Sequence, residues 1–525
     1  MTTFSYNHKH THSHSNSPFR GLGGFVGGFL NSPFRGLRGL TGLILLLLAL
    51  TARGQETRKL TLSQAIDIAR EGSVDAAVAI NQLRSSYWEY RTYRAQYLPE
   101  VNFTATLPTY NKRYSAYQLT DGTYTFVRDN YLGLSGALSI DQNIPLTGGT
   151  LSLQTSLDFL RQLDSGAQNR YMSIPVALTL SQPIFGVNTL KWDKKIEPVR
   201  YREAQAAYLE ATEQVAMSAI GYYFNLLLAK VSVEVAEQNL DNALRLAEVA
   251  KVQRTMGRIS KNDSLQMELN VLDARSTLTS AQSTYKSSMF NLRSFLGFED
   301  NVVIEAEVPE HIEFALVDYD DALQKALEYN DFSLNIRRRQ LEADYSVAQA
   351  KGNLRQITLY AQFGYTGTGQ TFKAAYDPLK DNQVVQLGIQ IPLLDWGKRR
   401  GQVKVAESNR QLVEAQLRQE AMNFRQDLFI LVERFNNQQQ QVLIAEGAND
   451  IAGRRYATNV ETFVLGRIST LDLNDSQVKK DEARSDYIYQ LYYYWYYYYQ
   501  LRSLTLWDYA LGTNIDADFD RLIKN

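Results

Sequence analysis

One turn motif occurs twice in this chain, and the repeat constrains the fold more than any other feature of the sequence. The two copies have the same four residues, which are Gly257, Arg258, Ile259, Ser260 and Gly466, Arg467, Ile468, Ser469. Each copy is preceded at the same interval by a short apolar segment with a proline, Pro183 in one case and Pro392 in the other. Because two landmarks share one offset, we predict a duplicated architecture of strand, long helix, tight turn and returning helix.

We place the first repeat at residues 55–305 and the second at 306–525. Each repeat contains one long helical stretch, at about 188–256 and about 399–463, and the first is broken at most near Pro198. At 1.5 Å per residue each stretch predicts a helix of roughly 100 Å, several times the usual length in globular proteins. Shorter helices are predicted on either side of the long ones, at 61–98, 263–296, 320–354 and 471–504. Two short helices placed end to end match one long helix, which predicts an elongated helical wall with all strands at one end.

Period-two alternation of apolar residues predicts strands between the helices. It occurs at 101–107, 132–140, 151–159, 174–180, 359–365 and 385–391. Alternation of this length suits a transmembrane strand with one lipid face and one lumen face, and suits an ordinary half-buried strand almost as well. The pair at 132–140 and 151–159, joined by a turn at Thr147-Gly148-Gly149, occurs only in the first repeat. This pair either extends a barrel or forms an external hairpin.

The predicted strands are too few for one chain to form a membrane barrel alone, since single-chain barrels begin at about eight strands. An open sheet edge in lipid would leave backbone groups without hydrogen bonds. We therefore expect several chains to share one barrel. Three chains that contribute four strands each would give about twelve, and the internal repeat would add quasi-sixfold symmetry.

Residues 1–54 have the features of a signal peptide with an unusual N-terminal extension. Two arginines precede the apolar run 40–50, which is too short to span a bilayer as a helix. Ala52-Arg53-Gly54 places small residues where a signal peptidase reads them, so Gln55 is the expected mature start; the alternative is an uncleaved anchor. No apolar run of about 20 residues follows, so we expect no transmembrane helix in the mature chain.

Composition argues against several classes of function. The chain has no cysteine, and four of its five histidines precede the expected cleavage site. We therefore predict no metal site, no cofactor and no enzymatic activity, since metal and triad chemistry rely on these residues. The formal net charge is -1, which provides no basic field for nucleic acid.

The order and spacing of these features resemble the TolC family of bacterial outer-membrane efflux proteins. The resemblance covers nearly everything from Leu60 to Asp508. It rests on both strand-to-helix junctions, both Gly-Arg-Ile-Ser turns, the repeat-opening helices around 65–69 and 322–326, and the Tyr97-Leu98-Pro99 entry to the first strand. It implies a membrane α+β fold in which three copies form a homotrimeric channel-tunnel. The copies share one transmembrane β-barrel, which is continued by a long periplasmic α-helical barrel.

The same resemblance implies a function and a set of partners. The expected role is a passive conduit of a tripartite efflux or type I secretion system in the cell outer membrane, surrounded by outer-membrane lipid. A periplasmic membrane-fusion adaptor and an inner-membrane pump of the RND, ABC or MFS class would open it at its periplasmic tip. The alternative is a structural or adhesive periplasmic coiled-coil protein without a pore.

The resemblance also assigns roles to three aspartates near the second turn and the first. Aspartates at the offsets of Asp472 and Asp475 narrow the periplasmic entrance in this family and can bind cations, and Asp263 matches a position that links neighbouring helices in the closed state. This chain has Ile468 and Phe463 where the closing bonds of the family use an arginine and a tyrosine. The alternative is that Asp472 and Asp475 are solvated charges favoured by the helix dipole.

The turn and junction residues have simpler expected roles. Gly257 and Gly466 should adopt turn conformations that a Cβ would strain. In this family the Arg-Ile-Ser residues that follow them lie where an adaptor docks; the alternative is turn chemistry alone. The predicted strand–helix junctions contain Pro183, Gly186, Pro392 and Gly397.

A tyrosine-rich run at 492–499 lies within the last long helix. Large aromatic residues on every face of a helix predict packing between helices, which we expect near the base of the barrel. An aromatic membrane girdle and a ligand-stacking platform are the alternatives.

Overall fold

The computed structural model describes residues 56–164, 166–310, 316–354, 356–390, 394–465 and 467–524. The chain divides into two units, Met1–Gln55 and Glu56–Asn525, and the fold described here is that of the second. The expected signal peptide at 1–54 lies outside the described residues, as do Pro392 and Gly466.

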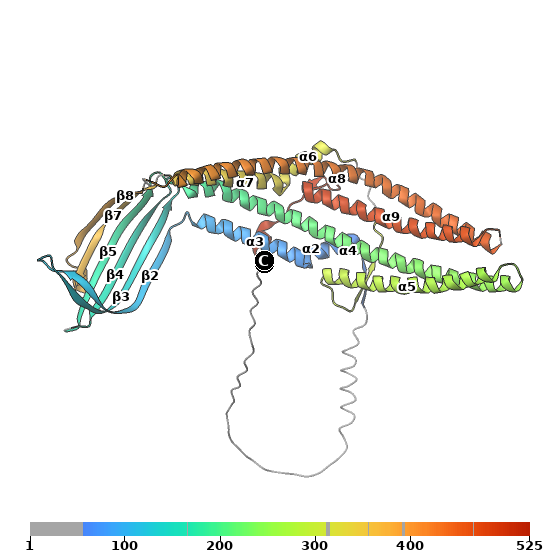
Figure 1. Ribbon diagram of the computed structural model, residues 1–525, viewed down its shortest axis with the longest axis horizontal. Helices are drawn as coiled ribbons and strands as arrows, with labels where there is room; N and C mark the ends of the chain where they lie inside the picture. The colour runs from blue at the N-terminus through green and yellow to red at the C-terminus, as the bar shows by residue number, and fades with distance from the viewer. Residues whose placement is uncertain are drawn as a thin grey trace, which may run out of the picture. The chain divides into compact units, whose positions relative to one another are not determined.

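The helices repeat in the predicted order (Figure 1). Those of the first repeat are α2 (Leu62–Gly72), α3 (Val74–Ala95), α4 (Thr189–Thr255) and α5 (Lys261–Phe295). Their counterparts in the second are α6 (Tyr319–Tyr329), α7 (Asp331–Gly352), α8 (Lys398–Val464) and α9 (Thr470–Thr505). Both α4 and α8 contain 67 residues, which corresponds to roughly 100 Å. The predicted repeat of helix lengths is therefore confirmed.

The opening helix of each repeat is broken where the sequence predicted continuity. Ser73, between α2 and α3, has an extended backbone, and its side chain accepts a hydrogen bond from the N–H of Ala76. Asn330 does the same between α6 and α7, accepting from the N–H of Phe332 at 2.9 Å. Each residue caps a new helix, so the predicted single helices are in fact pairs.

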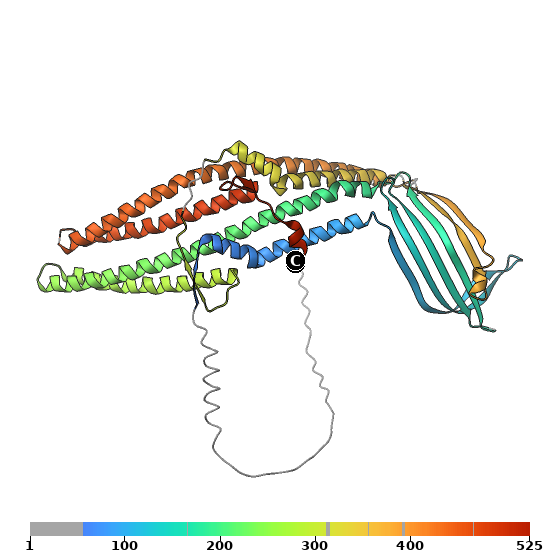
Figure 2. The same cartoon turned by 180° about the vertical axis from the view of Figure 1, so that it is seen from behind.

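The helices form one continuous layer in which each long helix is flanked by short ones. α3 and α5 both pack along α4, and α7 and α9 both pack along α8. α4 also contacts α7 and α9, which joins the two repeats. The order across the layer is therefore α3-α4-α7-α8 next to the sheet and α5-α4-α9-α8 at the far end (Figure 2). The predicted pairing of two short helices with one long helix is confirmed.

Six strands form a single antiparallel sheet at one end of the helices (Figure 1). In sheet order they are β2 (Glu100–Gln118), β3 (Tyr124–Ile144), β4 (Gly149–Gln162), β5 (Gln168–Pro183), β7 (Gln356–Gly369) and β8 (Lys380–Gln390). β3 and β4 are the strand pair for which the sequence allowed either a barrel extension or an external hairpin. They lie inside the sheet between β2 and β5. Its predicted turn is confirmed, with Gly148 at φ +78°.

Shorter elements complete the fold. β1 (Glu56–Leu60) pairs in parallel with β6 (Val302–Ala306), which ties the start of the first repeat to its end. The remaining elements are η1 (Lys373–Ala375), β9 (Trp507–Asp508), β10 (Thr513–Asn514) and α10 (Phe519–Lys524).

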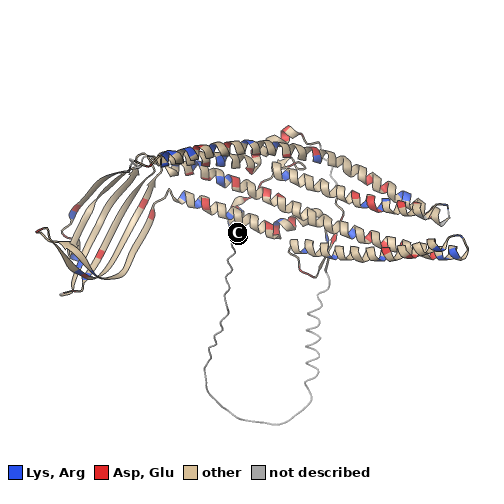
Figure 3. Cartoon of the chain, in the orientation of Figure 1, with Lys and Arg blue, Asp and Glu red and all other residues tan. Residues whose placement is uncertain are grey.

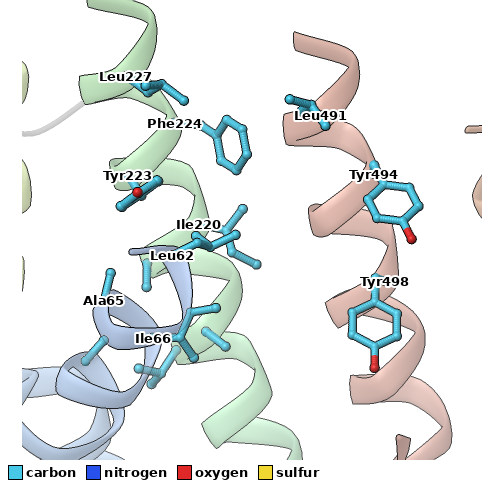
Figure 4. Close-up of a cluster of buried hydrophobic side chains, with 14 of the residues drawn as sticks. Leu62, Ala65, Ile66, Ile220, Tyr223, Phe224, Leu227, Leu491, Tyr494 and Tyr498 are labelled. Atoms are coloured by element: carbon cyan, nitrogen blue, oxygen red, sulfur yellow. The ribbon is translucent and has the colours of Figure 1, made fainter. Parts of the chain in front are cut away.

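The main hydrophobic core lies where α2, α4 and α9 meet (Figure 4). α2 contributes Leu62 and Ile66, and α4 contributes Tyr223 and Phe224. From the tyrosine-rich run of α9, Tyr494 and Tyr498 are 0% and 3% exposed, and they contact Phe435 of α8. Packing between helices is thus confirmed for this run. The predicted location near the base of the barrel was wrong, because α9 ends beside α2 and α6, at the ends of α3 and α7 away from the strands (Figure 1).

Among the described residues, one helix, α4, contains a stretch that is long and apolar enough to cross a membrane. Of that stretch, 61% is buried inside the chain. Burial of this extent fits a core helix, because α4 packs against neighbours on several sides. The prediction that no such apolar stretch follows residue 55 was therefore wrong, although the stretch belongs to the helical core.

Candidate functional site at the hairpin tips and the sheet

Each long helix ends in a tight turn at the end of the molecule away from the sheet. Gly257 follows α4 with φ +70°, a left-handed conformation that glycine adopts without strain. The N–H of Arg258 donates to the carbonyl of Gln253 at 2.9 Å, and the N–H of Arg467 donates to that of Thr462 at 3.1 Å. These equivalent bonds close the C-terminal turns of α4 and α8 in the same way. The predicted turn at Gly257 is confirmed, and Gly466 lies outside the described residues.

The returning helices begin with matching capping boxes. The N–H groups of Asp263 and Asp472 donate to the hydroxyls of Ser260 and Ser469, at 3.1 and 3.2 Å. Each aspartate accepts in return from the backbone N–H of its serine, at 3.1 and 3.3 Å. This reciprocal arrangement satisfies N–H groups that the first helical turn leaves free. The hydrogen bonds from Ser469 also hold the pKa of the Asp472 carboxyl below its ordinary value.

Asp475 has a different partner. Its Oδ2 lies 2.7 Å from Nη2 of Arg455 on α8, and both side chains are about half exposed. The ion pair joins the two arms of the second hairpin. The first hairpin has Gln266 at the equivalent position, and that side chain bonds to Asn270 on its own helix. The two tips are therefore similar in their turns but different in charge.

The three predicted gate residues thus have partners within their own chain. Asp263 and Asp472 complete the capping boxes of α5 and α9. For Asp472 this agrees with the alternative of a charge at a helix N-terminus. Asp475 pairs with Arg455. The hydrogen bonds of Asp263 are with Ser260, at the start of its own helix. The role of all three at a threefold mouth remains a prediction.

A cleft of about 300 Å³ separates the two hairpins near their tips. It lies between α4 and α5 on one side and α8 and α9 on the other. Phe463, which stands where the closing bond of the TolC family uses a tyrosine, lines this cleft together with Leu473 and Met267. Its ring therefore occupies space between the hairpins and offers no hydrogen bond there.

Polar contacts that sequence reasoning missed bridge the hairpins at this cleft, beginning with Asn239 in its lining. The amide of Asn239 donates to Asp481 at 2.7 Å, and the amide of Asn242 donates to the hydroxyl of Tyr456 at 2.8 Å. Burial raises the pKa of the Tyr456 hydroxyl, so it stays neutral. A further ion pair joins Glu234 and Arg484 at 3.0 Å. The only signal in the sequence was the spacing of Asn239 and Asn242 on one face of α4.

The predicted junction residues lie where strands pass into helices. Pro183 is the last residue of β5, and Gly186 follows it before α4. Gly397 caps α8 with φ +83°, and Asp395 accepts hydrogen bonds from the N–H groups of Gly397 and Arg399. The last contact satisfies a free donor at the start of the long helix.

The two faces of the sheet differ in polarity, and the strand register places one row of side chains on each. One row crosses five strands with only exposed apolar side chains, namely Val101, Ile140, Leu153, Leu178 and Phe363. The adjacent row on the opposite face is polar or small, namely Asn102, Ser139, Gln154, Ala177, Gly364 and Asn382. Charged residues are sparse on the sheet and dense along the helices (Figure 3). This distribution is typical of membrane strands with a lipid face and a lumen face.

The chain matches a known protein family over most of its length. The family model for the outer membrane efflux protein matches residues 65–298 and 330–504. The chain belongs to the outer membrane efflux protein family. The two matched segments fall in the two repeats, and none of the curated proteins matches the chain.

Solved channels share this fold at low sequence identity. The CmeC outer membrane channel of Campylobacter jejuni has a TM-score of 0.61 and 13% identity, over 88% of each chain. The outer membrane protein VceC of Vibrio cholerae has a TM-score of 0.59 and 15% identity, over 87% of this chain and 97% of that one. The MtrE outer membrane channel of Neisseria gonorrhoeae, in its open state, has a TM-score of 0.54 and 14% identity, over 87% and 90%.

The predicted TolC-like outer-membrane efflux channel is therefore confirmed. The sheet forms the outer-membrane part of a channel-tunnel, and the helices form its periplasmic part. The alternative of a periplasmic coiled-coil protein without a pore is not favoured. The family is one of channel components, which places this chain in transport.

Proposed function

We propose that three copies of this chain form the outer-membrane conduit of a tripartite efflux or type I secretion system. A periplasmic membrane-fusion adaptor docks at the hairpin tips, and an inner-membrane pump of the RND, ABC or MFS class delivers the cargo. The observation that carries the channel role is the family match over both repeats. The cargo moves without bond chemistry, through a passage that opens and closes at the tips.

Both lateral edges of the chain support assembly with further copies. Within the described residues, β2 and β8 are the two ends of the sheet, and each has one edge without a strand partner. Helices at opposite edges of the layer expose apolar side chains, which are Leu265, Leu269 and Leu272 of α5 and Val405, Leu412, Ile444 and Ile451 of α8. Open edges are costly in lipid, and large exposed apolar stripes mark interfaces. A ring in which the α5–β2 side of one copy meets the α8–β8 side of the next covers both edges.

The tips supply the moving part in this proposal. Residues Gly257 to Ser260 and Gly466 to Ser469 form the docking surface for the adaptor, with the exposed Arg258 and Arg467 at its front. Asp263, Asp472 and Asp475 surround the mouth. The ion pair of Asp475 with Arg455 and the contacts between the hairpins hold the closed position, and docking shifts the hairpins apart. Because these contacts are polar and partly exposed, separating them costs little free energy.

Purification and planar-bilayer recording test the conduit. The protein should require detergent, appear as trimers in native mass spectrometry and conduct ions after insertion from one side. Extraction without detergent and absence of current would instead support the coiled-coil alternative.

Cysteine cross-linking tests docking, because the chain has no cysteine of its own. Ile259→Cys and Ile468→Cys should cross-link to a co-expressed membrane-fusion adaptor from the same organism. Val74→Cys, an exposed position far from the tips, is the matched control. Equal cross-linking at all three positions would contradict docking at the tips.

A further inference from the structure

The strand pair β3–β4 has no counterpart in the second repeat. In each repeat one strand follows the short helix and one precedes the long helix: β2 and β5 in the first, β7 and β8 in the second. β3 and β4 are inserted between β2 and β5 and pair with both of them along most of their length. A hairpin outside the sheet would leave β2 beside β5. The observed order instead separates these strands by two others.

The inserted strands carry the same two faces as the rest of the sheet. Ile140 of β3 and Leu153 of β4 lie in the apolar row between Val101 and Leu178. Ser139 and Gln154 lie in the polar row on the opposite face. A strand that was not part of a membrane wall would have no reason to keep one row apolar and exposed.

We propose that β3 and β4 are strands of the pore wall, so that each copy contributes six strands and the trimer forms a barrel of eighteen. The count of six rests on the sheet, and the count of three copies rests on the proposed function above. β2 leads away from the helices and β8 returns to them, so β8 of one copy meets β2 of the next in antiparallel orientation. An even number of strands per copy allows this pattern around the whole ring.

Six strands also fit the width of the helical layer. Next to the sheet each copy has four helices, α3, α4, α7 and α8, in the same order as the strands attached to them. At an interaxial distance of 8–10 Å these helices occupy about 32–40 Å of the circumference. Strands about 4.8 Å apart and tilted by about 40° occupy roughly 6 Å each, so six cover about 38 Å and four only about 25 Å. Six strands therefore continue the helical wall without a step.

A barrel of this size changes where the conduit is narrow. Eighteen strands give a backbone diameter of about 36 Å, compared with about 24 Å for twelve, and roughly twice the cross-section. The membrane segment then matches the helical tunnel in width. Selection of cargo by size falls to the hairpin tips, and any solute that fits the tunnel can leave through the barrel.

Spin labels at adjacent positions test the wall assignment. Leu153→Cys and Gln154→Cys lie on opposite faces of β4. On β5, Leu178→Cys is the register partner of Leu153, and Thr179→Cys lies on the opposite face, where its register partner is Ser152. In lipid nanodiscs, labels at 153 and 178 should collide with oxygen more than with a water-soluble nickel complex, and labels at 154 and 179 should show the reverse. Equal exposure to the nickel complex at 153 and 154, with alternation kept at 178 and 179, would overturn the proposal.

Cryo-electron microscopy of the unsubstituted protein in nanodiscs removes any effect of the labels. Six wall strands per copy would support the proposal, and four wall strands with a detached hairpin would overturn it. Native mass spectrometry of the same sample counts the copies separately. A number other than three would contradict the proposed trimer while the strands per copy are still read directly.

Discussion

Arg455 on α8 donates a hydrogen bond to Asp475 on α9, with 2.7 Å between Nη2 and Oδ2, and so joins the two arms of the second hairpin at its tip. Both side chains are about half exposed, so the pair contributes at most about 1 kcal/mol. A contact of this strength is suited to a gate, because it biases one position without fixing it.

Arg455→Ala should therefore release the tip without unfolding the protein. We expect the open fraction in planar bilayers to rise by up to about fivefold, which corresponds to about 1 kcal/mol, with little change in thermal stability. Asp450→Ala is the matched control, because it removes an exposed ion pair with Arg454 on the same helix. A similar rise in current with both substitutions would count against a specific role of the Arg455–Asp475 pair.

Cation block provides a second test of the mouth. Asp472→Asn with Asp475→Asn should weaken block of the current by a trivalent cation such as lanthanum, because three copies would lose six carboxylates. Asn at 472 still accepts a hydrogen bond, so the helix cap is kept. Glu482→Gln, on an exposed turn of the same helix, is the control. Unchanged block in the double variant would remove Asp472 and Asp475 from the gate.

The pH dependence of this block follows from the lowered pKa of the Asp472 carboxyl. Because its folded pKa lies below the ordinary value, the carboxylate stays ionised as the pH falls from 7 to about 5. Block should persist over that range and fade only at lower pH. The capping contribution of Asp472 should likewise be present above the unfolded pKa and disappear as the pH falls through the folded one.

The order and lengths of the long helices could be predicted because helical periodicity and turn glycines can be recognised within a short stretch of sequence. The bounds of α4 and α8 agree with the prediction within a few residues. The breaks at Ser73 and Asn330 were missed, because a helix cap in mid-pattern leaves the apolar spacing on both sides intact. The contacts of Asn239 with Asp481 and of Asn242 with Tyr456 could not be predicted, because they depend on how two hairpins far apart in the sequence pack together.

The strands were found but their extent and partners were not. β2 and β3 contain 19 and 21 residues, much longer than the apolar alternation indicated. Their outer parts pair only with each other, from Lys112 opposite Asn130 to Gln118 opposite Tyr124. The pairing of β4 with β3 ends at Tyr131. Charged residues such as Lys112 and Arg113 interrupt the apolar pattern there. Alternation of apolar residues indicates the part of a strand that faces lipid. Strands that pair beyond the lipid need no such alternation, so the sequence does not show their full length.

A carboxyl pair in the helical part predicts pH-dependent stability. Burial and the neighbouring carboxyl of Asp331 raise the pKa of Glu210 to about 7. A raised folded pKa means that the folded state binds more protons between the two pKa values, so stability should fall as the pH rises from about 4.5 to about 7. Glu210→Gln should raise the stability at pH 8 by about 1–2 kcal/mol and change little at pH 5. Thermal melts at both pH values measure this.

Glu237→Gln, an exposed carboxyl on the same helix, is the control for Glu210. It should leave the stability unchanged at either pH. A Glu210→Gln variant with the same Tm difference from the parent at pH 5 and pH 8 would show that its carboxyl does not titrate in this range.

A buried charge network predicts the largest loss of stability. Glu213 is 1% exposed and pairs with Arg70 of α2 and with Arg502 of α9, at 2.9 Å in the second case. Arg502 also pairs with Asp508. Glu213→Ala would leave two arginines without their common partner, which should destabilise the chain by about 3 kcal/mol or more. Denaturant unfolding measures the loss, and Glu213→Gln, which keeps an acceptor and the volume, should lose less.

Two glycines without close neighbours separate backbone strain from packing. An added Cβ would meet no atom within 4 Å at Gly257 or at Gly221 in the middle of α4, but only Gly257 has a positive φ. Gly257→Val should therefore strain the turn by about 1–2 kcal/mol and reduce export, with trimers still formed. Gly221→Ala should instead stabilise α4 by about 0.5–1 kcal/mol and leave export unchanged. Export by the Gly257→Val variant at the parent rate would show that the shape of the first tip is not needed for docking.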